Sequence, residues 1–296
     1  MCSVTQPHTT AELLLEANFK ECRPKFTPGV PNTLLTTRDC PTDDDKEERA
    51  FMKDKPYRSR IGSLLWLARI SRPDIQYQVG CLARASHNPS RKHWNAVDHL
   101  LRYLAHTQHQ GIIYTKVDAV SEVPGQWKPT MWHDATWAPD YGDFFDNYRS
   151  VTGWCASVGS ADGKQLGNLV SWGSNRQSVV ALSTAESEWY AATDAAKEAL
   201  YLKDLFTAVN KPFHGKILIC CDNKATIAQS LNAVDQKKSR HMGMRAHFLR
   251  QQCHSGNLEL CYVDTKSERG DVLTKVLPVI DHERMMTLLG VGAMAA

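Results

Sequence analysis

The sequence predicts an α/β fold in the C-terminal half of the chain, and three observations lead to this prediction. Residues 217–221 (ILICC) form an uninterrupted apolar run rich in β-branched side chains, which is typical of a strand covered on both faces. Residues 151–172 contain two strand patterns joined by the turn sequence Ser-Ala-Asp-Gly, which indicates an antiparallel pair. Residues 183–209 form a long helical pattern that opens with Ser-Thr-Ala-Glu, the spacing of a capping box.

The elements expected from residue 129 onward alternate between strands and helices. The predicted strands are residues 130–137, 151–158, 169–172, 216–221 and 258–263. The predicted helices are residues 183–209, 224–231, 241–254 and 268–277, with Gly256 placed as a helix C-terminal cap.

The first part of the chain predicts a different organisation. Residues 1–55 carry five prolines and the acidic run Asp-Asp-Asp, and we expect a loosely ordered segment with one short helix near residues 9–19. Residues 57–106 show three amphipathic helical stripes. Their basic side chains fit either a solvated surface or contact with a phosphate backbone: Arg58, Arg60, Arg69, Arg72, Arg84, Arg91 and Lys92.

Composition limits the class of protein. The 296 residues suggest about two domains, and the formal net charge of +3 permits nucleic-acid binding without requiring it. The nine cysteines form no CxxC pair, which predicts reduced thiols and an intracellular protein, cytoplasmic or nuclear. The chain shows neither a secretory signal nor an apolar run of membrane-spanning length, so we expect no secretion and no membrane partner.

Acidic residues recur at the ends of the predicted elements. Asp134 lies on the first strand, Asp222 ends the fourth, and Asp271 lies in the last helix. In the long helix the capping box gives Glu186 a structural task, which leaves Glu188 as the acid without one. Converging carboxylates need cations, and hard oxygen ligands suit Mg²⁺ or Mn²⁺. A helix-capping role is the alternative for Asp222.

Many segments of the chain resemble the Pol polyproteins of copia-type retrotransposons. Residues 57–114 are similar to the C-terminal part of the reverse transcriptase, and residues 132–278 are similar to the ribonuclease H domain that follows it. The resemblance rests on motifs in the family's order: WHDATWAPD, VTGW, LVSWGSNRQSVVALSTAESEWYAA, CDNKATIA, KSRHMGMRAHFLRQ, YVDT and DVLTKVLP.

The resemblance implies a fold and an activity. The fold is a ribonuclease H-like mixed five-stranded sheet with flanking helices, preceded by a small, mostly helical segment like a reverse-transcriptase thumb or connection. The activity is metal-dependent hydrolysis of the RNA strand of RNA–DNA hybrids, with two Mg²⁺ ions for which Mn²⁺ can substitute. The implied metal-binding and catalytic residues are Asp134, Glu188, Asp222 and Asp271. Candidate nucleic-acid contacts are Lys237, Lys238, Arg240, Arg245 and Arg250, for which a solvated basic surface is the alternative.

The resemblance also sets the expected domain boundaries and partners. We expect an N-terminal segment and linker (1–55), a helical remnant (56–114), a second linker (115–128), the ribonuclease H-like domain (129–280) and a C-terminal tail (281–296). Expected partners are the hybrid and the upstream reverse-transcriptase and integrase parts of the polyprotein.

Three alternative functions were compared with the ribonuclease, and only one of them stays open. The paired-aspartate polymerase motif has no counterpart here, so we expect no polymerase activity. A catalytically inactive retroelement remnant, or a fragment that binds nucleic acid without cutting it, stays open. An integrase-like strand transferase is disfavoured because that class needs a three-acid set with different spacing.

Overall fold

The structure is a computed structural model of the 296-residue chain. The structure describes residues 1–19, 21–115, 127–139, 148–160, 168–212, 215–231 and 243–293. None of the helices described there is both long and apolar enough to cross a bilayer.

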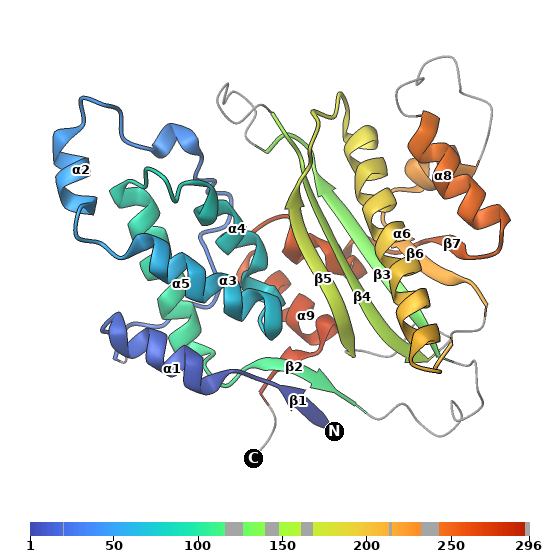
Figure 1. Ribbon diagram of the computed structural model, residues 1–296, viewed down its shortest axis with the longest axis horizontal. Helices are drawn as coiled ribbons and strands as arrows, with labels where there is room; N and C mark the ends of the chain where they lie inside the picture. The colour runs from blue at the N-terminus through green and yellow to red at the C-terminus, as the bar shows by residue number, and fades with distance from the viewer. Residues whose placement is uncertain are drawn as a thin grey trace.

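The N-terminal part of the chain is a helical unit, drawn in blue and teal in Figure 1. Its elements are β1 (Cys2–Val4), α1 (Pro7–Glu16), α2 (Lys46–Met52), α3 (Tyr57–Ile70), α4 (Gln76–Arg84), α5 (Arg91–His106) and β2 (Gly111–Tyr114), with 3₁₀ turns at Thr37–Asp39 and Pro73–Ile75. One apolar cluster joins α1, α3, α4 and α5, and it includes the fully buried Leu64, Leu82 and Leu101. The amphipathic stripes expected in residues 57–106 are therefore the core of this unit.

The C-terminal part is built on a mixed five-stranded sheet of order β5-β4-β3-β6-β7. The strands are β3 (Trp127–Thr136), β4 (Val151–Ser160), β5 (Leu169–Arg176), β6 (Ile217–Cys221) and β7 (Leu258–Tyr262). The first three pair antiparallel, whereas β3 with β6 and β6 with β7 pair parallel. This arrangement confirms the predicted ribonuclease H-like fold class, and it aligns the carboxyl ends of β3, β6 and β7 at one edge.

Helices cover both faces of this sheet. The long α6 (Thr184–Ala208) packs on one face through small side chains such as Ala192, Ala195 and Ala199, with α8 (Gly243–His254) beside it. The other face is covered by the 3₁₀ helix Arg269–Leu273 and by α9 (Val279–Leu289). The remaining elements are α7 (Lys224–Leu231), the 3₁₀ turn Thr265–Ser267 and β8 (Val291–Gly292).

Local signals in the sequence place several of these boundaries correctly. Ser183 is the N-cap of α6, where its Oγ accepts a hydrogen bond from the Glu186 backbone N–H. Gly256, expected just after α8, has a φ of +75°, a conformation that glycine adopts without steric cost. The segment expected as a helix over residues 268–277 is instead the shorter 3₁₀ helix Arg269–Leu273.

Both ends of the chain are more ordered than the sequence suggested. Leu13 and Leu14 of α1 belong to the buried core, and β1 pairs with β2. At the other end, Met285 and Leu289 of α9 are buried against the large sheet, and β8 pairs with β2. The expectations of a loose N-terminal segment and a C-terminal tail missed this packing, because each segment is too short to show its partners in its own sequence. The linker expected at residues 115–128 lies mostly outside the described residues.

A buried polar network also corrects one expected surface residue. The guanidinium of Arg72 is 2.7 Å from the Asp74 carboxylate, and both side chains are fully buried. The Tyr103 hydroxyl donates a hydrogen bond to Asp74 and lies 2.9 Å from His282 Nε2 of α9. Arg72 is therefore a structural residue at the junction between the helical unit and α9, and it cannot contact a phosphate backbone.

Candidate active site

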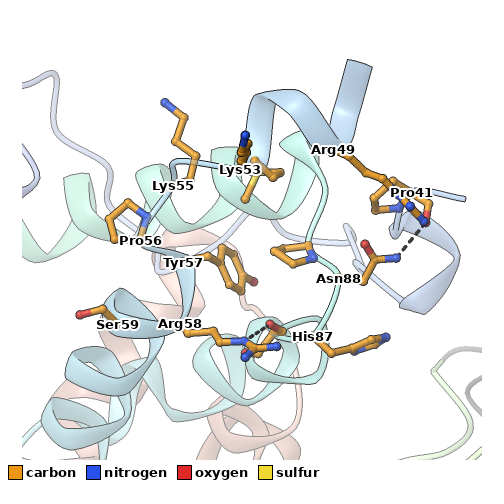
Figure 2. Close-up of a pocket in the computed structure, with 13 residues that line it drawn as sticks. Pro41, Arg49, Lys53, Lys55, Pro56, Tyr57, Arg58, Ser59, His87 and Asn88 are labelled. Carbon is orange, nitrogen blue, oxygen red and sulfur yellow. Dashed lines mark hydrogen bonds between the residues drawn. The ribbon is translucent and has the colours of Figure 1, made fainter. Parts of the chain in front are cut away.

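The helical unit contains a basic cavity of about 350 Å³ between α2 and the helices α3 and α4. Figure 2 shows its lining, which includes Arg49, Lys53, Lys55 and Arg58 and has no acidic side chain. Arg58 is held in place because its Nε donates to the Ser86 carbonyl at 2.8 Å. A concave surface with this charge suits an anion such as a phosphate group.

A second and more specific site lies at the carboxyl ends of β3 and β6. In the parallel register Trp132 is level with Cys220, so Asp134 and Asp222, each two residues further on, come level on neighbouring strands. Neighbouring strands are about 4.8 Å apart. Asp134 is buried and Asp222 is half-buried, and a hydroxyl donates to each: Thr274 to Asp134, and Thr265 to Asp222 at 3.0 Å.

Asp271 reaches this edge because the 3₁₀ helix Arg269–Leu273 packs directly on the sheet. A Cβ atom on Gly270 would meet the backbone of His133 and Asp134 at 2.7–2.9 Å, and one on Gly153 would meet Thr274, Leu273 and the Gly270 carbonyl at 2.7–2.8 Å. The two glycines therefore permit a close approach that any other residue would block. Lys275 Nζ then lies 2.8 Å from Asp271 Oδ1 and 3.6 Å from Asp134 Oδ2.

Glu188 enters from the opposite face of the sheet, in the second turn of α6. Glu186, two residues earlier, accepts a hydrogen bond from the Leu182 backbone N–H at 2.7 Å, so the capping residue and the site residue are distinct. Glu188 is 5% exposed, and its Oε2 has no hydrogen-bond donor among the described residues. Orphaned buried carboxylate oxygens are uncommon in native proteins and need an explanation.

The electrostatics of this edge are those of crowded like charges. Burial, together with the Asp134 and Asp222 carboxylates, raises the pKa of Glu188 to about 9. Burial and Asp134 likewise raise the pKa of Asp271 to about 7, although Lys275 opposes the rise. Burial lowers the pKa of Lys275, but Asp134 and Asp271 outweigh it and bring that pKa to about 12. The site therefore has more carboxyl groups than Lys275 can pair with, and part of them hold protons in the absence of a metal ion.

The residues fit a hard divalent cation. Four carboxylates from β3, α6, the end of β6 and the 3₁₀ helix lie within electrostatic reach of one another. Carboxylate oxygens are the ligands that Mg²⁺ and Mn²⁺ prefer, and a bound cation would remove the repulsion that raises these pKa values. The structure thus brings Asp134, Glu188, Asp222 and Asp271 to one edge, although their role as metal ligands stays a prediction.

Sequence reasoning missed several neighbours of the four acids. Lys275 follows Asp271 by four residues, and Thr274 directly precedes Lys275. Glu268 is fully buried, and burial raises its pKa well above the ordinary value, with Asp134 and Asp271 adding to the rise. The Glu268 carboxylate accepts a hydrogen bond from the Gly270 backbone N–H at 2.9 Å, so this side chain caps the start of the 3₁₀ helix. Among these neighbours only Lys275 has a signal in the sequence, because its spacing of four residues from Asp271 is that of a helical ion pair.

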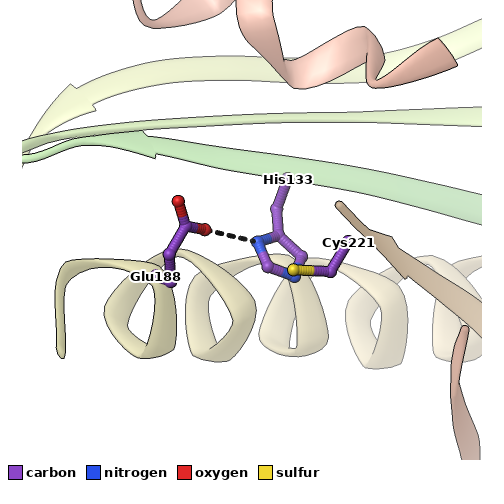
Figure 3. A group of neighbouring side chains, drawn as sticks. All are labelled: His133, Glu188 and Cys221. Carbon is purple, nitrogen blue, oxygen red and sulfur yellow. Dashed lines mark ion pairs between the residues drawn. The ribbon is translucent and has the colours of Figure 1, made fainter. Parts of the chain in front are cut away.

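A second missed group adjoins Glu188. A ring nitrogen of His133, the Cys221 sulfur and a Glu188 oxygen lie within 4.8 Å of one another, all in buried side chains. Figure 3 shows the three side chains converging from β3, β6 and α6. His133 and Cys221 each precede a predicted metal ligand by one residue, so alternation along the strands places them on the opposite face of the sheet.

The predicted nucleic-acid contacts are only partly described. Lys237, Lys238 and Arg240 lie outside the described residues. Arg245 and Arg250 are on α8 and are half-buried, and the Arg245 guanidinium stacks on the Tyr190 ring of α6 at 4.0 Å. This contact fixes the position of Arg245, while its role in binding nucleic acid stays a prediction.

The fold and site together define a class. A mixed sheet with three antiparallel strands followed by two parallel ones, and with carboxylates gathered where β3 and β6 end, is ribonuclease H-like. A ribonuclease H1 from Halobacterium salinarum is a structural neighbour with a TM-score of 0.35 and 15% identity, and the match covers 50% of this chain and 94% of the neighbour. No family model matches the chain.

Sequence relatives place the chain more closely. It is 31% identical over 288 residues to the retrovirus-related Pol polyprotein from transposon TNT 1-94 of Nicotiana tabacum, and 30% identical over 288 residues to that from transposon RE2 of Arabidopsis thaliana. Each match covers 97% of this chain but only 20% and 18% of the respective relative. The chain is similar along nearly its whole length to the Pol polyproteins of plant copia-type transposons, and it spans about a fifth of the length of the curated relatives it matches.

Proposed function

We propose that this chain is a ribonuclease H that hydrolyses the RNA strand of RNA–DNA hybrids with divalent metal ions. The observation that supports the proposal best is the group of acidic side chains from four elements at one edge of the sheet, where Lys275 is the only described cation within ion-pairing distance of Asp134 and Asp271. Similarity to the Pol polyproteins of copia-type transposons supports the same reaction class. The substrate and the polyprotein partners are part of the proposal.

The site residues would either bind the metal ions or position the residues that bind them. Asp134, Glu188, Asp222 and Asp271 would hold two Mg²⁺ ions, for which Mn²⁺ can substitute. When bound, such ions activate water and stabilise the departing oxygen of a phosphodiester. Thr274 and Thr265 orient Asp134 and Asp222 by donating hydrogen bonds to them. The absence of a side chain at Gly153 and Gly270 lets the 3₁₀ helix, and with it Asp271, lie close against the sheet.

Basic surfaces would position the hybrid. The candidates are the cavity lined by Arg49, Lys53, Lys55 and Arg58 and the helix α8 with Arg245 and Arg250. Phosphate contacts of this kind fix the register of a nucleic acid without reading its sequence. We also propose an intracellular location, cytoplasmic or nuclear, which is supported by the nine reduced cysteines.

The proposal is tested by the variant Asp222→Asn in a cleavage assay. Asp222 is half-buried, so the substitution removes a charge without opening the core. We expect the purified full chain to cut a labelled RNA–DNA hybrid only with Mg²⁺, and the variant to be slower by about 1,000-fold or more. Its thermal unfolding midpoint should match that of the parent.

Asp264→Asn is the matched control. Asp264 lies just after β7, at the same edge, and is exposed, and its carboxylate accepts the Lys266 N–H at 2.9 Å. This control should cut at close to the parental rate. Equal rates for the parent and Asp222→Asn would refute the site assignment. A parent that binds the hybrid in a gel-shift assay but never cuts it would favour the second candidate, a nucleic-acid-binding fragment, which the basic cavity alone would support.

A further inference from the structure

The group formed by His133, Glu188 and Cys221 is not explained by the carboxylate site. His133 and Cys221 are each 1% exposed, and Glu188 is 5% exposed. His133 Nδ1 and Glu188 Oε2 are 3.8 Å apart, and neither atom has a hydrogen-bond partner among the described residues. Two buried polar atoms that face each other at this distance without a hydrogen bond are spaced much as two ligands of one metal ion are.

The donor types indicate which ligand would fit. A thiolate, an imidazole and a carboxylate are the ligands of Zn²⁺, whereas Mg²⁺ prefers oxygen alone. Zinc–ligand bonds of about 2.0–2.3 Å in a tetrahedron place neighbouring donor atoms roughly 3.4–3.6 Å apart. The three donors already lie within 4.8 Å of one another, so shifts within the reach of side-chain rotation would close the site.

One contact of Cys221 is compatible with a thiolate ligand, although burial raises the pKa of the thiol. The Asn223 backbone N–H donates to Cys221 Sγ at 3.3 Å, and this donor would also serve a metal-bound thiolate. The neighbouring Cys220 points to the other face of β6, where its sulfur is 3.0 Å from that of Cys261. The two adjacent cysteines therefore belong to different environments and can be tested separately.

We propose that His133, Glu188 and Cys221 form a binding site for a thiophilic divalent cation, Zn²⁺, and that zinc bound there withdraws Glu188 from the magnesium-binding carboxylates. Binding releases the Cys221 thiol proton to solvent, and water completes the zinc coordination. The binding part of this inference stands on the three donors alone. The inhibitory part rests on the proposed ribonuclease function.

Cobalt spectroscopy tests the binding site without any need for activity. Co²⁺ replaces Zn²⁺ in such sites, and a cobalt–thiolate bond gives a near-ultraviolet charge-transfer band. We expect this band on adding Co²⁺ to the metal-free full chain, and we expect Zn²⁺ to remove it. The Cys221→Ser variant should lack the band, and His133→Asn should weaken Co²⁺ binding by about 10-fold or more, the usual effect of losing one metal ligand or its support.

Cys155→Ser is the matched control, because Cys155 is a fully buried cysteine on the adjoining part of the same sheet. This variant and Cys220→Ser should keep the band. The inference is overturned if Cys221→Ser keeps the cobalt band or if Cys220→Ser loses it, since the second result would assign the thiolate to the Cys220–Cys261 pair. Circular dichroism of each variant separates a lost ligand from a lost fold.

Zinc inhibition tests the link to Glu188. At a fixed Mg²⁺ concentration, hybrid cleavage by the parent should fall as Zn²⁺ is added, and Cys221→Ser should need about 10-fold more Zn²⁺ for the same fractional loss. Equal zinc sensitivity in the two proteins would overturn the inhibitory part. If the parent does not cut at all, the proposed function fails, and the cobalt result still decides the binding site.

Discussion

Two buried polar clusters in this protein differ in whether their carboxyl groups are paired with cations. In the helical unit Arg72 and Asp74 form a bidentate ion pair, and Thr107 and Tyr103 satisfy their remaining donors and acceptors. At the end of β3 and β6, Asp134, Glu188 and Asp271 are buried together, with Lys275 as their described counter-ion. In the first cluster each carboxylate has its cation, whereas the second has more carboxyl groups than cations.

The difference separates a structural cluster from a candidate binding site. Asp74 keeps a pKa below its ordinary value despite the desolvation that opposes it, because Arg72 and Tyr103 stabilise its charged form. Glu188 has a pKa raised to about 9, first by burial and then by its acidic neighbours. A carboxylate that the protein itself does not neutralise is available to an external cation, whereas Asp74 is not.

The largest expected effect on stability is that of Asp74→Asn. The substitution leaves the Arg72 guanidinium buried without its counter-ion, and breaking a buried pair in this way costs about 3–5 kcal/mol. Urea unfolding of the full chain would measure the loss. Asp194→Asn is the control, because that exposed pair with Lys197 should change the free energy of unfolding by less than about 1 kcal/mol. Equal effects of the two substitutions would contradict the structural role of the buried pair.

The carboxylate site should show the opposite pH behaviour to an ordinary acidic surface. Because the folded-state pKa of Glu188 is about 9 against an ordinary value of 4.5, the folded protein holds a proton that the unfolded chain has released across that interval. Stability of the metal-free protein therefore falls as pH rises, by on the order of 3 kcal/mol between about pH 6 and about pH 8.5, and Asp271 adds to the fall up to its pKa of about 7.

Unfolding in the presence of a chelator at these two pH values would measure this slope. The Glu188→Gln variant should flatten it, because the titrating group is gone, and Mg²⁺ should stabilise the parent more at the higher pH. A slope of the opposite sign in the parent would show that the acids are already neutralised by the protein.

The smallest effect is expected for the neighbouring Glu186→Gln. Glu186 accepts the Leu182 N–H in front of α6, and losing such a capping interaction costs about 0.5–2 kcal/mol. Hybrid cleavage should continue in this variant. By contrast, Glu188→Gln should lose cleavage while the metal-free protein keeps its stability. Comparing thermal midpoints and rates for the two variants distinguishes the cap from the site, and the reverse pattern would exchange their roles.

Local sequence determined much of this protein. The apolar run before Asp222, the capping box at Ser183 and the stripes of residues 57–106 each depend on side chains within one or two turns of each other, so β6, α6 and the helical core could be predicted. The four acids could be singled out because they stand at element ends, and the family resemblance selected the same positions.

Only the tertiary structure decided which of these residues meet. The parallel register of β3 with β6 brings Asp134 level with Asp222, and the close approach of Gly270 to β3 brings Asp271 to the same edge. Long-range packing also buries Arg72, orders both ends of the chain and sets His133 against Cys221 and Glu188. These contacts join residues far apart in the chain, and their energies depend on burial and on neighbouring charges that no local sequence pattern encodes.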